Sequence, residues 1–222
     1  QCDWSSDVCS SDLRQAVNTV MRSVLTIAGS DSSAGAGIQA DLKTFAAHHV
    51  YGSTAITAIT AQYTRGVDAV LAIPADLVAA QIRAVASDLG VHAAKTGMLP
   101  TAEIVAVVAA MTAEIGLQWL VVDPVMVAKS GARLIDDAAV EAMRAQLLPH
   151  AFVVTPNIPE AEVLTGMRIL GDADRREAAA RIRALGPKAV IIKGGHIERP
   201  DIHDLLVDGD GQRSEEHTSE LQ

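Results

Sequence analysis

The sequence predicts one α/β domain in which helices cover a mostly parallel central sheet. Short runs of Val, Ile and Leu alternate along the chain with segments whose apolar residues recur at the helical period. Several of the apolar runs lack polar alternation, which is typical of parallel strands covered by helices on both faces. With 222 residues, 49% of them apolar, the chain is long enough for a substantial core. A three-layer α/β/α arrangement follows from these observations.

The apolar runs give the expected strands, and the helical patterns between them give the expected helices. The strands are predicted at Val24–Ala28, Ser53–Ala58, His92–Lys95, Trp119–Val122, Phe152–Val154, Ala189–Ile192 and, late in the chain, Asp204–Val207. The helices are predicted at Ala36–His48, Pro74–Leu89, Ala102–Glu114, Asp136–Leu147, Pro159–Leu164 and Ala173–Leu185. Pro74 and Pro159 stand at helix starts, where proline is tolerated. The helix over 102–114 is rich in Ala and Val, so we expect it to belong to the core.

The overall charge indicates a small-molecule partner. A formal charge of −9 and a pI near 5.2 argue against nucleic acid or an anionic membrane as partner, because phosphate-rich surfaces require basic proteins. No apolar run reaches the roughly 18 residues that span a bilayer, and no signal peptide opens the chain. We therefore expect a cytoplasmic protein.

Both ends of the chain are expected to lie outside the domain. Residues 4–13 and 213–222 correspond to translations of opposite strands of one short DNA, as a sequencing adapter at the two ends of an insert would produce. Both cysteines, Cys2 and Cys9, lie in the first ten residues. Residues 1–13 and 213–222 are therefore predicted to be adapter-like and disordered, with the domain over residues 14–212.

The segment Ile27–Phe45 predicts a ligand site. Its Gly-rich loop joins the first strand to the first helix, and Gly29, Gly35 and Gly37 would allow the backbone to approach a ligand closely. The helix that begins near Gly35 is expected to offer unpaired N–H donors, and Asp41 on its first turns could accept hydrogen bonds. The spacing is neither a dinucleotide-binding fingerprint nor a P-loop, so a turn that serves packing alone is the alternative.

Polar or glycine-rich residues follow each of the main predicted strands. In an open parallel sheet, ligands bind beyond the carboxyl ends of the strands, so these residues are expected to share one edge. They are Gly29 and Asp31, Gln62, Thr96–Met98, Asp123–Met126, Thr155–Asn157 and Lys193–His196.

These motifs, taken in order, resemble one enzyme family. The resemblance covers about Ser23 to Asp210 and rests on Ala28–Asp31, Ala34–Phe45, Thr60–Gln62, Lys95–Leu99, Asp123–Gly131, Thr155–Asn157 and Lys193–His196. The family is that of the hydroxymethylpyrimidine/phosphomethylpyrimidine kinases of thiamine biosynthesis, in the ribokinase-like superfamily. The resemblance implies transfer of the γ-phosphoryl group of ATP, with Mg²⁺, to 4-amino-5-hydroxymethyl-2-methylpyrimidine and then to its monophosphate. It also suggests a homodimer.

The resemblance assigns roles to individual residues. The pyrimidine pocket would be formed by Gly29, Asp41, Gln62, Met98 and Val125, with Asp41 and Gln62 on polar substituents and Met98 and Val125 on the ring. The nucleotide side would comprise Asn157 and Lys193 for ATP and Asp123 and Glu160 for Mg²⁺. For the last two residues, a turn before proline and a helix-dipole contact remain the structural alternatives.

One element of the family pattern has no counterpart in this chain. The family's Gly-Thr-Gly-Cys segment, which supplies the anion hole and the expected catalytic cysteine, matches nothing in the sequence. The resemblance therefore implies a fold that is incomplete at the C-terminus, a chain without its catalytic residue, and weak phosphoryl transfer. The alternatives are a pyridoxine or pyridoxal kinase of the same fold and a non-catalytic pyrimidine-binding module.

Overall fold

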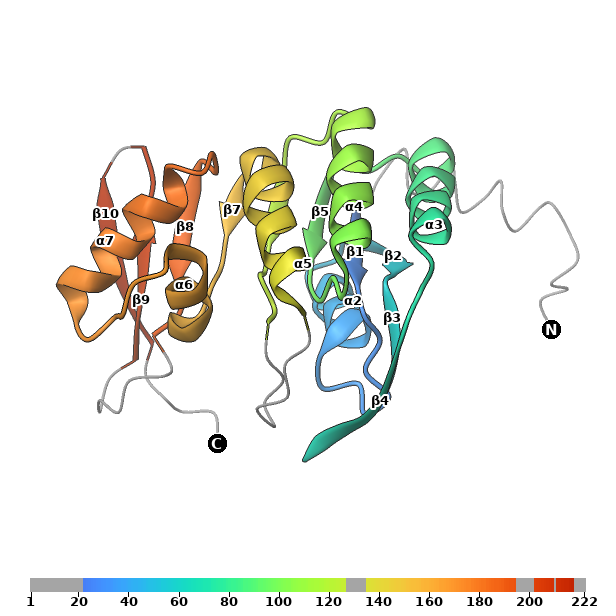
Figure 1. The fold of residues 1–222 in the computed structure, drawn as a ribbon. Coiled ribbons are helices and arrows are strands. Elements are labelled where there is room, and N and C mark those ends of the chain that lie inside the picture. The colour runs from blue at the N-terminus through green and yellow to red at the C-terminus, as the bar shows by residue number, and fades with distance from the viewer. Residues whose placement is uncertain (1–21, 127–134, 195–201, 210, 218–222) are drawn as a thin grey trace, which may run out of the picture.

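The computed structural model describes residues 22–126, 135–194, 202–209 and 211–217, which form an α/β fold around a mostly parallel sheet (Figure 1). The strands of the main sheet lie in the order β10-β9-β8-β7-β6-β5-β1-β2, and a separate hairpin holds β3 and β4. The strands are β1 Ser23–Ala28, β2 Tyr51–Ile56, β3 Ala58–Tyr63, β4 Gly66–Ala72, β5 Ala93–Thr96, β6 Leu120–Val122, β7 Val153–Val154, β8 Ala189–Ile192, β9 Ile202–Val207 and β10 Gln212–His217.

The helices occur where the 3.6-residue pattern placed them. They are α2 Gly37–Ala47, α3 Ala75–Asp88, α4 Ala102–Glu114, α5 Asp137–Ala142 with its π-helical continuation Met143–Leu147 and a 3₁₀ turn Leu148–His150, α6 Ile158–Thr165 and α7 Asp172–Arg183. The predicted fold class is confirmed, since β2, β1, β5, β6, β7 and β8 pair in parallel, while in the described part of this sheet β9 pairs antiparallel with both β8 and β10. Within the described residues, no helix is long and apolar enough to cross a membrane.

Strand alternation shows which helices lie on which face of the sheet. Leu25 and Ile27 of β1 are fully buried and share the core cluster with residues of α3 and α4. Thr26, between them, points to the other face, where its hydroxyl reaches Asp41 of α2. Helix α2 therefore packs against the face opposite to that covered by α3 and α4.

The two faces of strands β6 to β8 are buried to different degrees. Val122, Val154, Val190 and Ile192 have no exposed surface, whereas their strand neighbours Val121, Val153 and Ile191 are only half-buried. In Figure 1, helices α4 to α7 run along one side of these strands. The predicted cover by helices on both faces is therefore less complete over β6 to β8 among the described residues, because their second apolar face keeps part of its contact with solvent.

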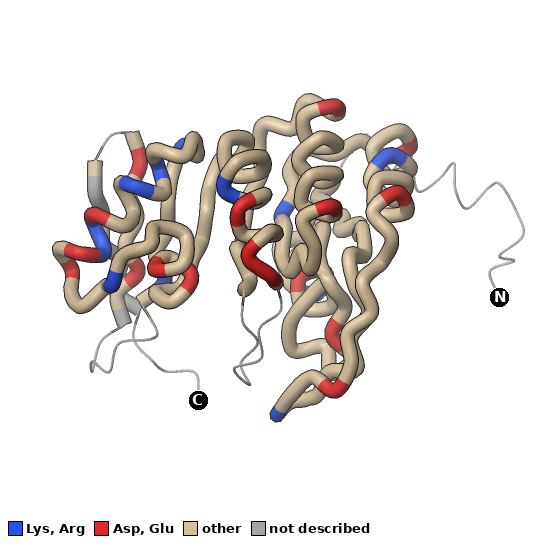
Figure 2. Tube along the Cα trace, in the orientation of Figure 1, with Lys and Arg blue, Asp and Glu red and all other residues tan. Residues whose placement is uncertain are grey.

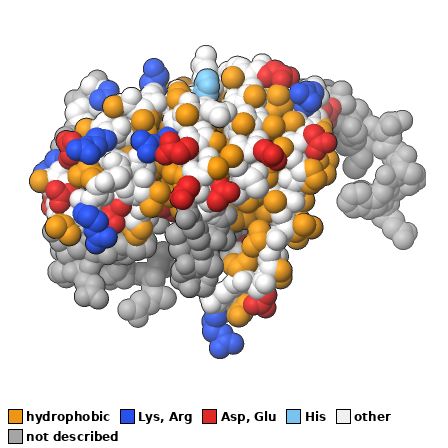
Figure 3. Space-filling view, viewed as in Figure 1, with side chains coloured by type: hydrophobic (Ala, Val, Ile, Leu, Met, Phe, Trp, Pro, Cys, Tyr) orange, Lys and Arg blue, Asp and Glu red, His pale blue; other side chains and the backbone are white. Residues whose placement is uncertain are grey.

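The predicted strand Ser53–Ala58 is divided in the structure. β2 ends at Ile56, and Thr57 then turns the chain out of the sheet, with its N–H bonded to the carbonyl of Ala28. β3 and β4 follow as an antiparallel hairpin that projects from the body (Figure 1). Gln62 thus lies within β3, not after a strand of the main sheet. The hairpin exposes Ile59, Tyr63, Val70 and Leu71, and apolar side chains are visible along it in Figure 3.

The expectation of disorder over residues 213–217 also differs from the structure. These residues belong to β10, which pairs antiparallel with β9 in register from Gln212 to His217. Asp208 stabilises the turn that reverses the chain direction between β9 and β10. Its carboxylate accepts the N–H of Gly211, and its own N–H bonds to the carbonyl of Gly211. That turn returns the chain along the otherwise open edge of β9. The adapter origin of the two ends stays a prediction, and residues 1–13 and 218–222 lie outside the described residues.

Candidate active site

A cavity of about 650 Å³ opens at the carboxyl ends of β1, β5 and β6, beside the amino end of α2 and the β3–β4 hairpin. All of the residues predicted for the pyrimidine pocket line it, and so does Asp123. The lining residues used below are Gly29, Asp41, Gln62, Lys95, Met98, Asp123 and Val125. The structure thus brings together residues that lie almost a hundred positions apart in the sequence.

The Gly-rich loop at the start of α2 is closed by a carboxylate of the chain itself. Asp31, 2% exposed, accepts hydrogen bonds from the N–H and hydroxyl of Ser33 and from the N–H groups of Gly35 and Ala36. The N–H of Ile38 bonds to the carbonyl of Gly29. The expectation that this helix start offers unpaired donors is therefore wrong at Gly35, Ala36 and Ile38, because a nearby acid and a carbonyl already satisfy them.

The same hydrogen bonds set the acidity of Asp31. Burial acts to raise its pKa, but the hydrogen bonds from Ser33, Ala36 and Gly35 outweigh burial and leave the pKa below the ordinary value of 3.8. Asp31 is thus an ionised group that shapes the loop. From the sequence, Asp31 is expected only to leave the first strand, although an acid before Ser-Ser-Ala-Gly is a recognisable turn signal.

Two glycines in this loop have neighbours that leave no room for a side chain. A Cβ on Gly29 would lie 2.6 Å from the terminal methyl carbon of Met98. Gly37 has a φ of +58°, and a Cβ there would lie 2.5 Å from the carbonyl oxygen of Gly29. The backbone of Met98 is fixed by a hydrogen bond, since its carbonyl accepts the hydroxyl of Thr57 at 2.6 Å. Gly29 is therefore in close contact with the Met98 side chain, and Gly37 with the main chain of Gly29.

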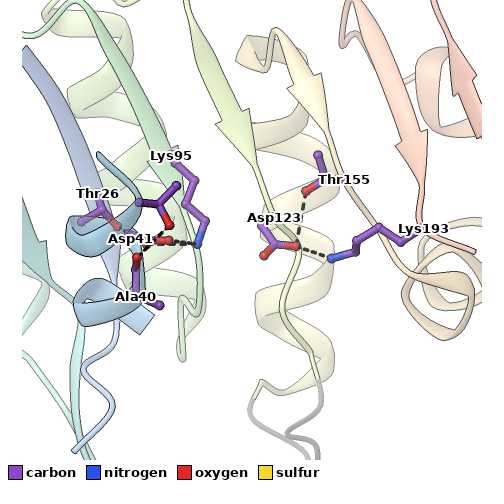
Figure 4. Close-up of polar contacts among 8 residues, drawn as sticks. Thr26, Ala40, Asp41, Lys95, Asp123, Thr155 and Lys193 are labelled. Carbon is purple, nitrogen blue, oxygen red and sulfur yellow. Dashed lines mark hydrogen bonds and ion pairs between the residues drawn. The ribbon is translucent and has the colours of Figure 1, made fainter. Parts of the chain in front are cut away.

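Asp41 lies at one end of the cavity in a network of three side chains (Figure 4). The Nζ of Lys95 lies 3.0 Å from Oδ1 and 3.1 Å from Oδ2 of Asp41, and the hydroxyl of Thr26 donates to Oδ2 at 2.6 Å. The predicted ligand-binding carboxylate thus already has partners on β1 and β5. Lys95 has no role among the residues predicted from the sequence.

Gln62 and Val125 complete the pyrimidine side of the cavity. Gln62 sits at the β-bulge of the hairpin, and its backbone N–H bonds to the hydroxyl of Ser32 at 3.3 Å. Val125 follows β6, and its N–H bonds to the carbonyl of Asp123. The hairpin and the end of β6 therefore close the cavity from opposite sides.

The other end of the cavity leads to the residues predicted for the nucleotide. Lys193 Nζ donates to Oδ1 of Asp123 at 2.9 Å, and the Thr155 hydroxyl lies 3.4 Å from the same oxygen (Figure 4). Asn157 forms a bridge to Lys193 between the ends of β7 and β8. The structure thus confirms that these strand-end residues are neighbours, while their roles stay predictions.

Asn157 and Glu160 form a capping box at the start of α6. The Asn157 side chain accepts the N–H of Glu160 at 2.9 Å, and the Glu160 carboxylate accepts the N–H of Asn157 at 2.8 Å. Burial raises the pKa of Glu160 above 4.5 and the Asp123 carboxylate adds to this, while the N–H groups of Asn157 and Met126 and the positive charge of Lys193 act against it. One carboxylate oxygen of Glu160, Oε2, is therefore already hydrogen-bonded at the start of α6.

The residues present fit Mg²⁺ to different degrees. No group of three or more His, Cys, Asp or Glu side chains that could hold a metal occurs among the described residues. Mg²⁺ often uses one or two carboxylates and completes its shell with water and substrate phosphates. Asp123 fits this pattern because its side chain is 23% exposed beside the cavity. Glu160, 5% exposed and bonded to the helix start, fits better through an intervening water.

Parts of two predicted motifs cannot be placed. Val127–Gly131 and Gly195–His196 lie outside the described residues.

Comparison with known proteins decides the family. Residues 31–221 match the family described as Phosphomethylpyrimidine kinase. The chain belongs to this family. It is 50% identical over 186 residues to the hydroxymethylpyrimidine/phosphomethylpyrimidine kinase of Bacillus subtilis, covering 83% of this chain and 69% of that protein. It is 53% identical over 187 residues to the thiamine biosynthesis bifunctional protein ThiED of Geobacter sulfurreducens, covering 84% of this chain and 38% of that protein.

Solved structures of family members and of pyridoxal kinases share the fold. The phosphomethylpyrimidine kinase of Clostridium difficile 630 superposes with a TM-score of 0.81 at 45% identity, covering 87% of this chain and 83% of that one. The pyridoxal kinase of Staphylococcus aureus, in complex with AMP-PCP and pyridoxal, superposes with a TM-score of 0.82 at 39% identity, covering 91% and 74%. The predicted ribokinase-like kinase fold is thereby confirmed.

Proposed function

We propose that the site phosphorylates 4-amino-5-hydroxymethyl-2-methylpyrimidine with ATP, and then phosphorylates the monophosphate, as a step of thiamine biosynthesis. One observation carries the proposal. Asp123 lines the cavity that holds the predicted pyrimidine residues and also bonds to Lys193 on the predicted nucleotide side. A substrate hydroxyl in the cavity would therefore lie next to the groups that meet the transferred phosphate.

The residues present suit phosphoryl transfer, which requires alignment and charge stabilisation more than covalent help. Lys193, 40% exposed at its side chain, would turn from Asp123 toward the phosphates of ATP as a point charge. Asp123 would then be free to orient the acceptor hydroxyl and to contribute an oxygen to Mg²⁺. When bound, Mg²⁺ neutralises charge on the phosphates.

The pocket residues account for the acceptor. Met98 would pack on one face of a flat ring, with Gly29 beneath it leaving the necessary space, while Val125 would cover the other side. Asp41 and Gln62 would bind the polar substituents of the ring. A homodimer and a cytoplasmic location stay expectations from the resemblance and the composition.

We further expect the chain as given to bind its acceptor and to transfer phosphate poorly. It contains no Gly-Thr-Gly-Cys segment, the source of the family's anion hole and catalytic cysteine. Losing one oriented donor at the developing charge typically lowers the rate about a hundredfold to a thousandfold. Turnover by the purified chain close to that of its relatives would contradict this expectation.

The test of the proposed function is a pair of measurements on the same protein. Calorimetric titration with the hydroxymethylpyrimidine should show binding that Asp41→Ala abolishes. A coupled assay with ATP and Mg²⁺ should show slow ADP release that Asp123→Asn lowers further. A folded chain that neither binds the pyrimidine nor releases ADP would refute the proposal.

A pyridoxal kinase is the second candidate, because solved pyridoxal kinases share the fold at about 40% identity. Competition decides between them. If the main proposal holds, pyridoxine should displace the hydroxymethylpyrimidine only at much higher concentration. The reverse order of affinities would favour the second candidate. Binding of the pyrimidine with no ADP release at all would favour the non-catalytic module.

A further inference from the structure

The network around Asp41 joins three separate elements beside the cavity. Asp41 lies on α2, Thr26 on β1 and Lys95 on β5. Thr26 and Lys95 are register partners across the parallel pair of β1 and β5, so their side chains leave the sheet side by side. Asp41 therefore receives its partners from a rigid part of the fold.

Lys95 is in a suitable position to hold the Asp41 carboxylate in one orientation. Its Nζ lies at nearly equal distances, 3.0 and 3.1 Å, from the two carboxylate oxygens. Side-chain exposure is 24% for Lys95 and 16% for Asp41, so solvent screens the pair only in part. Gly97 leaves room for the ammonium group, because a Cβ at that position would lie 3.4 Å from Nζ.

The bonds that are present leave the carboxylate able to accept a further one. An ionised carboxylate offers about four acceptor positions. Lys95 and Thr26 occupy three of them, and no other side chain among the described residues donates to the Asp41 carboxylate. A ligand in the cavity can therefore bind a carboxylate whose plane is already fixed.

The chemistry of the proposed acceptor selects the group that Asp41 would bind. A carboxylate accepts hydrogen bonds, and this pyrimidine carries two donor groups, the hydroxymethyl and the 4-amino group. The hydroxymethyl must face Asp123 and Lys193, where phosphate arrives. The amino group, on the neighbouring ring carbon, is the only other donor on the ring and is therefore the group left for Asp41, which lines the same cavity.

We propose that Lys95 is a positioning residue that orients the Asp41 carboxylate to accept the 4-amino group of the pyrimidine. The inference rests on the proposed function and deepens it by naming a determinant of specificity. Lys95 also cancels the charge of Asp41, so the neutral ring enters a site with no net charge from this pair. A ring without the amino group gains nothing from Lys95.

The test compares two ligands across a set of variants of the full chain. Calorimetry measures the Kd of the hydroxymethylpyrimidine and of its analogue that lacks the 4-amino group. The variants are Lys95→Met, Lys95→Arg, Asp41→Asn and the double variant Asp41→Asn/Lys95→Met, with Lys188→Met as the matched control. Lys188 is an exposed lysine that lines a separate depression near the end of α7. Urea unfolding of each variant establishes that it is folded.

We expect Lys95→Met to weaken binding of the ligand with the amino group and not of the analogue without it. Lys95→Met should weaken binding of the amino ligand about tenfold to a hundredfold, and Lys95→Arg should restore most of it. Binding of the analogue should change by less than about threefold, which is below what loss of a charged hydrogen bond produces. The double variant should bind the amino ligand no more weakly than Asp41→Asn alone, because the two residues act as one unit. Lys188→Met should match the wild type.

Two results would overturn the inference while leaving the proposed function intact. One is equal weakening of both ligands in Lys95→Met, which would show a general structural role. The other is additive effects of Asp41→Asn and Lys95→Met, which would show that Lys95 does not act through Asp41. If Lys95→Met fails to fold, the double variant, which has no unpaired charge, still gives the comparison with Asp41→Asn. A folded wild type that binds neither ligand would refute the proposed function, and this inference with it.

Discussion

Asp31 organises the start of α2 through a carboxylate that accepts three backbone N–H groups and one hydroxyl. Because its pKa in the folded chain lies below 3.8, its stabilisation is complete above that value and is lost as the pH falls through the folded pKa. The loop is therefore more stable at neutral pH than in acid.

Asp31→Asn should lower the free energy of unfolding by about 2 to 3 kcal/mol at pH 7, since a charged acceptor of several bonds is replaced by a neutral one. Urea unfolding measures the loss. The difference from wild type should shrink as the pH falls below about 3.8. Asp68→Asn, at an exposed acid of β4, is the control and should change little. A difference that stays constant down to pH 3 would contradict the role of the charge.

Glu160 has the opposite dependence on pH. Its pKa is raised, so the unfolded chain loses this proton at a lower pH than the folded chain. Relative to Glu160→Gln, the wild type should lose stability as the pH rises from 4.5 toward the folded pKa, and the difference should then stay constant. Gln can still accept the N–H of Asn157, so the helix cap is kept. Urea unfolding across this pH range checks the slope, and a rise in relative stability would contradict it.

At the scale of elements, the start of α6 combines a structural and a proposed binding role. Asn157→Ala removes the cap and should lower the free energy of unfolding by about 1 kcal/mol. It should also weaken ATP binding, measured by calorimetry. Thr101→Ala removes the cap of α4, where the Thr101 side chain accepts the N–H of Ile104, and should lower stability similarly without changing ATP affinity. If both variants bind ATP as tightly as the wild type, Asn157 serves only as the helix cap and does not bind the nucleotide.

The elements that the sequence predicted well are those whose pattern depends on burial. Ala102–Glu114 and Ala189–Ile192 were predicted with the bounds that the structure has, because both are apolar segments between clear turn signals. The hairpin was missed because β4 is exposed along most of its length and carries little of the pattern that burial imposes. β10 was missed because its pairing depends on a turn at Asp208 and on the free edge of β9.

For the site, the positions of the residues were predicted from the sequence, but their side-chain partners were not. Residues at strand ends were placed together correctly, since parallel strands bring their carboxyl ends to one edge. The partners of those residues were not predicted, because Lys95 meets Asp41 and Lys193 meets Asp123 only through side-chain geometry across distant elements. A lysine within a buried strand was the available signal for Lys95, since an ammonium group in such a place requires an acid nearby.

At the scale of the whole molecule, charge and apolar surface are distributed differently. Figure 2 shows acidic and basic residues interspersed over α6 and α7, with no continuous basic face in this view. This agrees with the small-molecule partner that the composition predicts. The half-buried face of β6 to β8 presents Val121, Val153 and Ile191 instead.

A pair of adjacent substitutions tests how much that face contributes to stability. Ile192→Thr places a hydroxyl in the fully buried layer and should lower the free energy of unfolding by about 2 to 4 kcal/mol. Ile191→Thr, one residue earlier on the half-buried face, should lower it by less than about 1 kcal/mol. Equal losses in the two variants would show that both faces are packed alike.

The contact of Gly29 with Met98 and of Gly37 with Gly29 restricts how this pocket can evolve. A side chain at position 29 requires the terminal methyl group of Met98 to move, and its flexible side chain or a shorter residue at position 98 allows this. Position 37 offers no such route, because its neighbour is a main-chain oxygen that no substitution removes and its backbone is left-handed. Change of substrate in descendants of this protein is therefore expected to begin at Met98 or on the hairpin, with the glycines following or staying as they are.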